Sequence, residues 1–274
     1  MAQVKSQKEL AFLHDLYVAP DWGERFAELV DAHVHLPKEG RALYVAAGTG
    51  SHALALKERA GEKLQLLCVD ESDDCLDLAR AKGAAINEKT QFQREAPSSL
   101  SQADDQFDLV LGNMSMTRPG DLRAILSELV RVAAPGGTVA FWLPTVASFG
   151  EFFSIFWEAL LNAELEDHGV DVERMITELP TASEAEKLAQ SEGLDAVQSW
   201  TAVEEFDYES AEQFLNSPLM TDFLLPGWLG SVPQAAKERV IEEVARIIDE
   251  ERHSGAFVLS LKATLVVGKK GRVQ

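Results

Sequence analysis

Two glycines and an aspartate are the residues of this sequence whose spacing is best suited to chemistry. Gly48 and Gly50 directly follow a short apolar run, and Asp70 stands at the end of the next one. Glycine lacks a Cβ and tolerates positive φ, so such a turn lets a bound molecule approach the backbone. The following helix presents free N–H groups and a positive dipole end there. Because an aspartate can accept hydrogen bonds from a ribose diol, the spacing predicts a site for a ribose-containing cofactor.

Apolar runs that alternate with helical segments must position these residues. The expected strands cover residues 42–46, 64–69, 91–93, 107–111 and 138–143, and the helices between them cover 51–59, 74–82 and 122–132. Buried runs of this kind are typical of parallel strands covered on both faces. Right-handed crossovers then predict a doubly wound α/β fold with a mostly parallel sheet. Ligands of such sheets bind at the carboxyl ends of the strands.

The first forty residues predict an N-terminal helical cap before an α/β domain of residues 41–274. The helical pattern breaks at Ala19-Pro20-Asp21, so we expect a second helix that Asp21 caps and that ends at about Pro37. The two parts make up the expected domain organisation.

The residues after Pro144 are more irregular. A helical stripe of aromatic side chains from Phe149 to Leu161 indicates either a core face or the lining of an apolar pocket. The chain then predicts a strand at 195–206, a helix at 234–251 and a long closing strand at 255–268. Between them, an apolar insertion at about 210–233 contains prolines and glycines and cannot be one regular helix. The sequence leaves open whether this insertion covers a pocket, packs in the core or forms a dimer contact.

Four segments resemble, in order and spacing, the class I S-adenosylmethionine-dependent methyltransferases. They are residues 43–50, 69–72, 107–110 and 134–138. Within that group the chain is similar to the small-molecule branch around ubiquinone and menaquinone biosynthesis, and its closing strand fits the reversed last strand of that fold. The resemblance implies S-adenosylmethionine as cofactor, with these residues around it: Tyr44, Ala46, Ala47, Gly48, Gly50, Asp70, Glu71, Cys75, Glu95, Ala96, Gly112 and Asn113.

The resemblance also implies roles for these residues. Gly48 and Gly50 let the methionine part of the cofactor approach the backbone, and Asp70 holds the ribose hydroxyls. Asn113 faces the methionine part or the substrate. Beside the adenine, the resemblance implies Glu71 or Cys75, and it puts Glu95 and the Ala96 backbone near the adenine amino group.

Two residues depart from the family pattern. The family usually has an acid at the position of Tyr44, where it helps to hold the amino group of the cofactor, and a glycine at the position of Ala46. The hydroxyl of Tyr44, Tyr17 or another group from the first helices could replace the acid. Because of these departures, the alternative remains open that the protein is non-catalytic and only binds the cofactor or a partner.

The bulk composition limits the partners. A formal net charge of −20 and a pI of about 4.7 disfavour nucleic acids and anionic membrane surfaces. Two cysteines fit a reduced compartment, and since no signal peptide or membrane span is expected, the prediction is a cytoplasmic protein. His33-x-His35 lacks the further ligands of a metal site, so no metal is expected.

The predicted function is therefore methyl transfer to a small, apolar molecule by direct displacement, with donor and acceptor held close in a dry pocket. No residue is identified as a catalytic base. Gly48-x-Gly50-x-x-Ala53 followed by Asp70 also satisfies a dinucleotide fingerprint, which makes a nicotinamide-dependent oxidoreductase the rival enzyme. The missing second mononucleotide half and Pro135-Gly136-Gly137 count against that rival. A homodimer is a further expectation.

Overall fold

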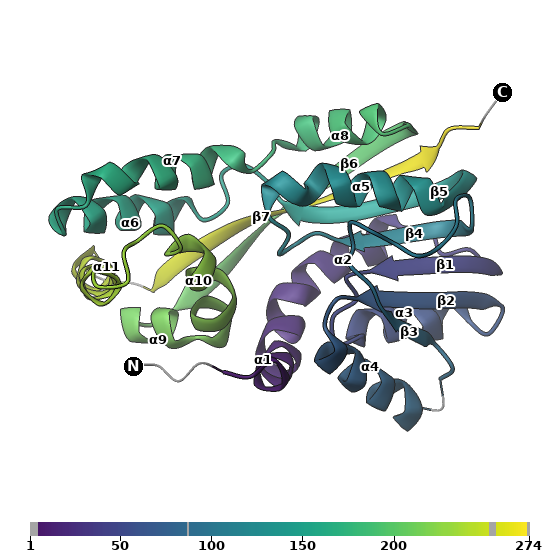
Figure 1. Cartoon of the computed structure of the whole chain (residues 1–274), viewed down its shortest axis with the longest axis horizontal. Helices are drawn as coiled ribbons and strands as arrows, with labels where there is room; N and C mark the ends of the chain where they lie inside the picture. Colours follow the sequence, from purple (N-terminus) through teal and green to yellow (C-terminus); the bar gives the residue numbers. More distant parts are fainter. Residues whose placement is uncertain (1–4, 87, 252–255, 273–274) are drawn as a thin grey trace. The chain divides into compact units, whose positions relative to one another are not determined.

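The computed structural model describes residues 5–86, 88–251 and 256–272. The strands in these ranges form one seven-stranded sheet in the order β3-β2-β1-β4-β5-β7-β6 (Figure 1). They are β1 (Gly40–Val45), β2 (Leu64–Asp70), β3 (Gln91–Arg94), β4 (Phe107–Asn113), β5 (Ala133–Pro144), β6 (Leu194–Tyr208) and β7 (Phe257–Lys270). β1 to β5 pair in parallel, whereas β7 is the one reversed strand. This order confirms the predicted α/β fold.

The chain divides into two compact units, each described here by itself. The first unit consists of residues 1–143, 181–201 and 263–274, and the second of residues 144–180 and 202–262. The glycine turn and Asp70 both belong to the first unit.

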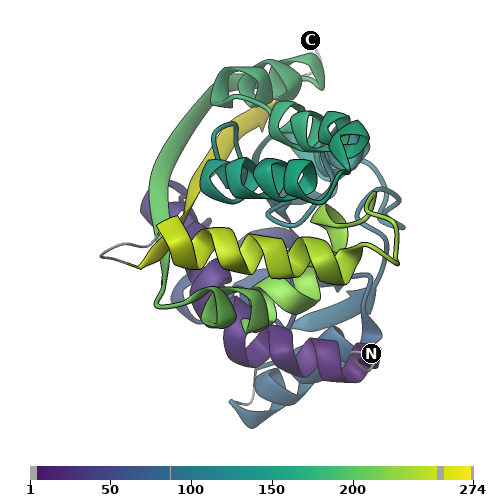
Figure 2. The ribbon, with the colours of Figure 1, turned by 90° about the vertical axis from the view of Figure 1, so that its left-hand side faces the viewer.

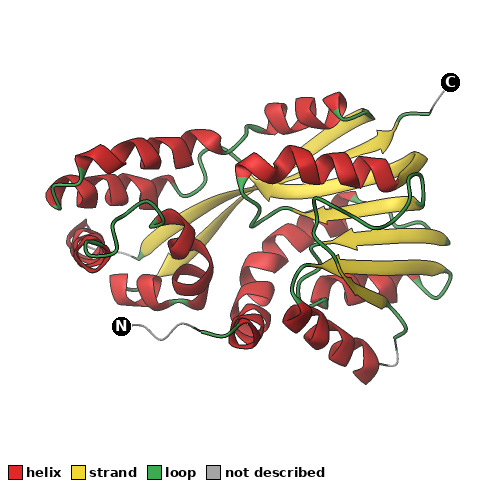
Figure 3. Ribbon diagram, in the orientation of Figure 1, coloured by secondary structure: helices red, strands yellow, loops and turns green. Residues whose placement is uncertain are grey.

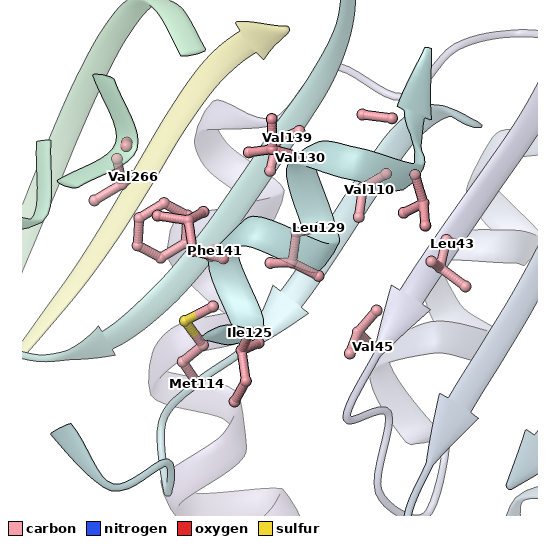
Figure 4. Close-up of a cluster of buried hydrophobic side chains, with 14 of the residues drawn as sticks. Leu43, Val45, Val110, Met114, Ile125, Leu129, Val130, Val139, Phe141 and Val266 are labelled. Carbon is pink, nitrogen blue, oxygen red and sulfur yellow. The ribbon is translucent and has the colours of Figure 1, made fainter. Parts of the chain in front are cut away.

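Helices cover both faces of the sheet in the first unit. Because side chains alternate along a strand, one set of strand residues faces α5 (Leu122–Val132), as Figure 4 shows for Leu43, Val110 and Phe141. The intervening residues Tyr44 and Trp142 contact His52 of α3 (Ser51–Ala60) on the other side. The remaining helices of the sheet region are α4 (Asp73–Ala85), α8 (Ala182–Ser191) and the 3-10 turn η2 (Pro119–Asp121).

The prediction of a helix break at Ala19-Pro20-Asp21 was wrong. Helix α1 (Gln7–Leu13) continues without interruption through the π-helix η1 (His14–Gly23) into α2 (Glu24–His33) (Figure 3). Pro20 lies inside η1, and Asp21 caps no helix. A π-helical turn is wider than an α-helical one, which reduces the clash of a proline ring with the preceding turn. Val18 and Trp22 are buried on either side of the proline, so packing holds the helix together where the local signal predicts a break.

The aromatic stripe and the insertion form a packed core in the second unit. Phe152 and Phe156 of α6 (Gly150–Asn162) stack with ring centroids 5.6 Å apart, and Trp228 from the insertion stacks on Phe152 at 4.6 Å. The insertion folds as α9 (Ala211–Asn216), the π-helix η4 (Leu219–Leu224) and α10 (Leu225–Trp228), which confirms that it is not one regular helix. Helix α11 (Lys237–Glu251) runs beside α6 (Figure 2), and η3 (Glu166–His168) and α7 (Gly169–Glu178) complete the unit. Of the alternatives for the insertion, core packing is therefore observed.

No helix within the described ranges has the length and apolar character needed to cross a bilayer.

Candidate functional site

The turn between β1 and α3 adopts the backbone conformation that its glycines predict. Ala46, Gly48 and Gly50 have φ of 55°, 55° and 78°, so left-handed residues alternate along the turn. The Ala47 N–H donates to the Val69 carbonyl at 3.1 Å, and the Gly50 N–H donates to the Ala47 carbonyl at 3.0 Å. A Cβ on Gly50 would lie 2.7 Å from the Cβ of Ala79 in α4, so this position requires glycine on two grounds.

Asp70 links the end of β2 to this turn. One carboxylate oxygen accepts the Gly48 N–H at 2.8 Å, and the other accepts the Ser72 N–H at 2.9 Å. Asp70 is only 9 % exposed, and this burial raises its pKa although the two backbone donors oppose the change. The structure therefore brings Gly48 and Asp70 together, as the sequence predicts. The carboxylate keeps lone-pair capacity for a further donor, because each of its two oxygens can accept two hydrogen bonds.

Glu95 lies at the same edge, but its side chain is engaged elsewhere. The Glu95 N–H donates to the Asp70 carbonyl at 2.9 Å, which puts its backbone beside the end of β2. Its carboxylate accepts hydrogen bonds from the Ser101 N–H and hydroxyl and from the Gln102 amide, at 2.7–2.9 Å. Ala96 forms a bridge with Ser99. In this state the Glu95 side chain orders the loop after β3.

Two other predicted neighbours of Asp70 are Glu71, which directly follows β2, and Cys75 in the first turn of α4. Cys75 is half-buried, its N–H donates to the Ser72 hydroxyl at 3.2 Å, and burial raises the pKa of its thiol. Glu71 is exposed and its carbonyl accepts a hydrogen bond from Arg94. The structure thus gathers Glu71 and Cys75 around Asp70.

Gly112 and Asn113 end β4 with two separate roles. A Cβ on Gly112 would lie 2.4 Å from Leu129, so this glycine makes room for α5 to pack on the sheet. The Asn113 side-chain oxygen accepts the Ser115 N–H at 3.1 Å and the Ser115 hydroxyl at 2.7 Å. Trp22 of η1 donates to the same Ser115 hydroxyl at 3.2 Å, which ties the N-terminal helix to the end of β4.

Tyr44 points to the α3 face of the sheet. Its hydroxyl and His52 Nδ1 are 3.0 Å apart, and His52 Nε2 lies 3.1 Å from the Asp31 carboxylate, which also pairs with Arg59. Burial raises the pKa of Tyr44 well above its ordinary value, and burial lowers the pKa of His52 although Asp31 opposes the change. The Tyr44 hydroxyl is therefore neutral at physiological pH and engaged with α3.

Sequence reasoning missed three side chains that contact the glycine turn. Asp15 of η1 accepts the Thr49 hydroxyl at 2.6 Å and pairs with Lys82 of α4. Lys82 also donates to the Thr49 carbonyl at 3.0 Å, and the His14 ring lies 3.2 Å from where a Cβ on Gly48 would stand. Nothing in the spacing of the sequence links these residues, because the contact depends on where the N-terminal helix packs.

His33, one of the two histidines considered as metal ligands, lies beside an aromatic ring. His33 stacks on Trp200 with ring centroids 4.3 Å apart. Within the described ranges, no three His, Cys, Asp or Glu side chains are grouped so that they could hold a metal ion.

Comparisons with known proteins fit this geometry. Residues 42–137, which contain the glycine turn, Asp70 and the end of β4, match a family described as a methyltransferase domain. The match covers about a third of the chain, and it is the part that carries the proposed site. Demethylmenaquinone methyltransferases from Deinococcus radiodurans and Thermus thermophilus are 33 % and 32 % identical to the chain over 149 and 143 residues. These stretches cover 53 % and 51 % of this chain but 61 % and 63 % of the relatives, so the chain spans less than two thirds of their length.

Solved structures share the fold of the whole chain. The YcgJ protein of Bacillus subtilis covers 91 % of the chain with a TM-score of 0.59 at 18 % identity, and all of its own length is matched. Phosphoethanolamine N-methyltransferase 2 of Haemonchus contortus, solved with S-adenosyl-L-methionine, covers 98 % of the chain with a TM-score of 0.54 at 14 % identity and 61 % of its own length. Together with the methyltransferase domain match, these findings confirm the resemblance to the class I methyltransferases of the ubiquinone and menaquinone branch.

Proposed function

We propose that this protein transfers a methyl group from S-adenosylmethionine to a small, apolar molecule. The observation that carries the proposal is the pairing of the left-handed glycine turn with Asp70 at the ends of β1 and β2, within a matched methyltransferase domain. Gly48 and Gly50 adopt the left-handed conformation that opens the backbone of the turn, and the Asp70 carboxylate can accept a further hydrogen bond. The residues present therefore fit the cofactor.

The residues have distinct tasks in this proposal. Asp70 binds the ribose hydroxyls, and its bonds to Gly48 and Ser72 hold its carboxylate in one orientation for that purpose. The turn from Ala46 to Gly50 receives the methionine part, with Ala47 as part of its backbone, and Cys75, Glu71 and the backbone at Glu95 and Ala96 lie toward the adenine. When bound, the cofactor supplies a methyl group on a sulfonium, which needs alignment more than acid–base assistance when the acceptor is a reactive carbon or sulfur.

The N-terminal segment of residues 1–40 is proposed to cap this site. Supporting contacts come from η1, where Asp15 reaches Thr49 and Trp22 reaches Ser115. The acceptor is proposed to be apolar because the relatives are named demethylmenaquinone methyltransferases, so demethylmenaquinone is the first acceptor to test. A cytoplasmic location rests on the acidic charge and the two free cysteines. The acidic charge also supports the proposal that the protein does not bind nucleic acid. A homodimer remains a prediction, which light scattering can test.

Thermal unfolding with S-adenosylmethionine, S-adenosylhomocysteine and NAD in parallel tests the cofactor class. A ligand at a hundred times its dissociation constant stabilises by about 2.7 kcal/mol, which raises the Tm of a chain of this size by roughly 5–10 °C. A shift with the two sulfur compounds alone supports the proposal, and transfer of label from S-adenosylmethionine to an apolar acceptor completes it. A shift with NAD alone would favour the oxidoreductase, and binding without transfer to any acceptor would favour the non-catalytic alternative.

A further inference from the structure

A compact polar cluster lies directly on the glycine turn and is built from three separate parts of the first unit. Asp15 comes from η1, Thr49 from the turn itself and Lys82 from α4. Thr49 is 1 % exposed, while the side chains of Asp15 and Lys82 are 19 % and 30 % exposed. The Asp15 side chain is thus mostly shielded from solvent but keeps part of its surface exposed.

Lys82 holds this cluster in place. Its ammonium donates to the Thr49 carbonyl at 3.0 Å and to the Ser51 hydroxyl at 2.8 Å, and it pairs with Asp15. All contacts of the Asp15 carboxylate with described residues go to Oδ1, so Oδ2 accepts no hydrogen bond from the part of the chain that the structure describes. Burial raises the pKa of Asp15, but the hydrogen bonds from Lys82 and Thr49 outweigh it and leave the pKa below its ordinary value. The carboxylate is therefore charged at neutral pH.

The proposed cofactor ends in an α-amino acid, whose ammonium requires an anionic acceptor when it leaves water. Two other residues near the turn are less suited to accept it. Asp70 holds the backbone of Gly48 and Ser72, and the proposed function assigns its remaining acceptor capacity to the ribose hydroxyls. Tyr44 is neutral, and its hydroxyl is engaged with His52. Asp15 is the charged acceptor on the turn with an oxygen to spare.

We propose that Asp15 binds the α-ammonium of the cofactor through Oδ2, while Lys82 and Thr49 position its carboxylate through Oδ1. The proposal rests on S-adenosylmethionine being the cofactor. It assigns the N-terminal helix a direct part in the binding site. Asp15 would then supply the negative charge that β1 lacks, since Tyr44 stands there in place of the acid that the family usually has.

Calorimetric titration with two ligands tests this assignment. S-adenosylhomocysteine carries the amino-acid end, whereas 5′-methylthioadenosine has the same adenine, ribose and sulfur but lacks it. Asp15→Asn keeps the size of the side chain and removes its charge. We expect this variant to bind S-adenosylhomocysteine roughly 10- to 100-fold more weakly, the range for a lost hydrogen bond between charged groups. Its affinity for 5′-methylthioadenosine should change less than about twofold, because no ammonium is present in that ligand.

The control is Asp21→Asn in the same helix, where the exposed carboxylate pairs with Arg25 one turn away. This variant should bind both ligands like the wild type. Equal weakening of both ligands by Asp15→Asn would mean that Asp15 only supports the turn, and unchanged affinity for both would remove it from the site; either result overturns the assignment. Failure of the wild type to bind either ligand would instead overturn the proposed function, and the assignment with it.

Discussion

Substituting Gly50 by alanine should destabilise the protein strongly, and the structure separates the cost into two parts. Gly50 has φ of 78°, where an L-residue is strained, and the new Cβ would lie 2.7 Å from the Cβ of Ala79. The left-handed conformation costs about 1–2 kcal/mol and overpacking about 1–3 kcal/mol. Alanine also lowers the conformational entropy of the unfolded chain, which stabilises the folded protein by about 0.4–1 kcal/mol. The net loss in free energy of unfolding should therefore be about 2–4 kcal/mol.

Removing the obstructing methyl group should partly rescue the variant. Ala79→Gly alone costs about 1 kcal/mol in a helix interior, but combined with Gly50→Ala it relieves the overpacking. Urea unfolding of the wild type, both single variants and the double variant should therefore give a favourable coupling of about 1–3 kcal/mol. Strictly additive costs would refute the argument that contact with α4 requires this glycine.

Four further outcomes are expected. Asp70→Ala should weaken binding of S-adenosylhomocysteine by roughly 1.5–3 kcal/mol in calorimetry, since hydrogen bonds to a charged group are lost, and unchanged affinity would exclude Asp70 from the site. Gly48→Val should abolish that binding, because a branched side chain resists φ of 55° and its Cβ would lie 3.2 Å from the His14 ring, so the turn must distort; normal binding would disprove the role of the turn. Ala46→Gly should raise the free energy of unfolding by about 0.5–1 kcal/mol by removing left-handed strain, and a less stable variant would contradict this. Burial lowers the pKa values of His14 and His52. The unfolded chain then binds more protons than the folded one below about pH 6.5, so stability should be lost as the pH falls through that value. His52→Gln should weaken this dependence in urea unfolding between pH 7.5 and 5.5, and an identical pH profile would contradict it.

The sheet could be predicted from sequence because its signals are local. The buried runs end at turn residues in each case, and the helix predicted at 122–132 has the same bounds in the structure. The meeting of Gly48 and Asp70 follows from parallel strands alone, since their carboxyl ends share one edge. Strand β5 begins earlier than expected, at Ala133, because its first residues pair with β4 across an irregularity that no apolar run marks.

Other features depend on tertiary contacts that spacing does not reveal. Pro20 predicts a break in an isolated helix, yet burial of Val18 and Trp22 outweighs that tendency. Asp15 and Lys82 are 67 residues apart in the chain and meet because η1 packs over the glycine turn. The hydrogen bonds of Glu95 to Ser101 and Gln102 belong to a loop whose course no periodicity fixes. The expected strands could be located from their composition, whereas side-chain partners across the site could not.

The two cysteines have a practical consequence for experiments on this protein. Burial raises the pKa of both thiols, but Cys68 is fully buried in β2, whereas Cys75 is only half-buried in the first turn of α4. A thiol reagent applied to the native chain should therefore modify Cys75 first, since access and ionisation both govern thiol reactivity. Without any engineering, the wild-type sequence carries a single chemical handle at the edge of the proposed adenine site, and the rate of its alkylation reports whether that site is filled.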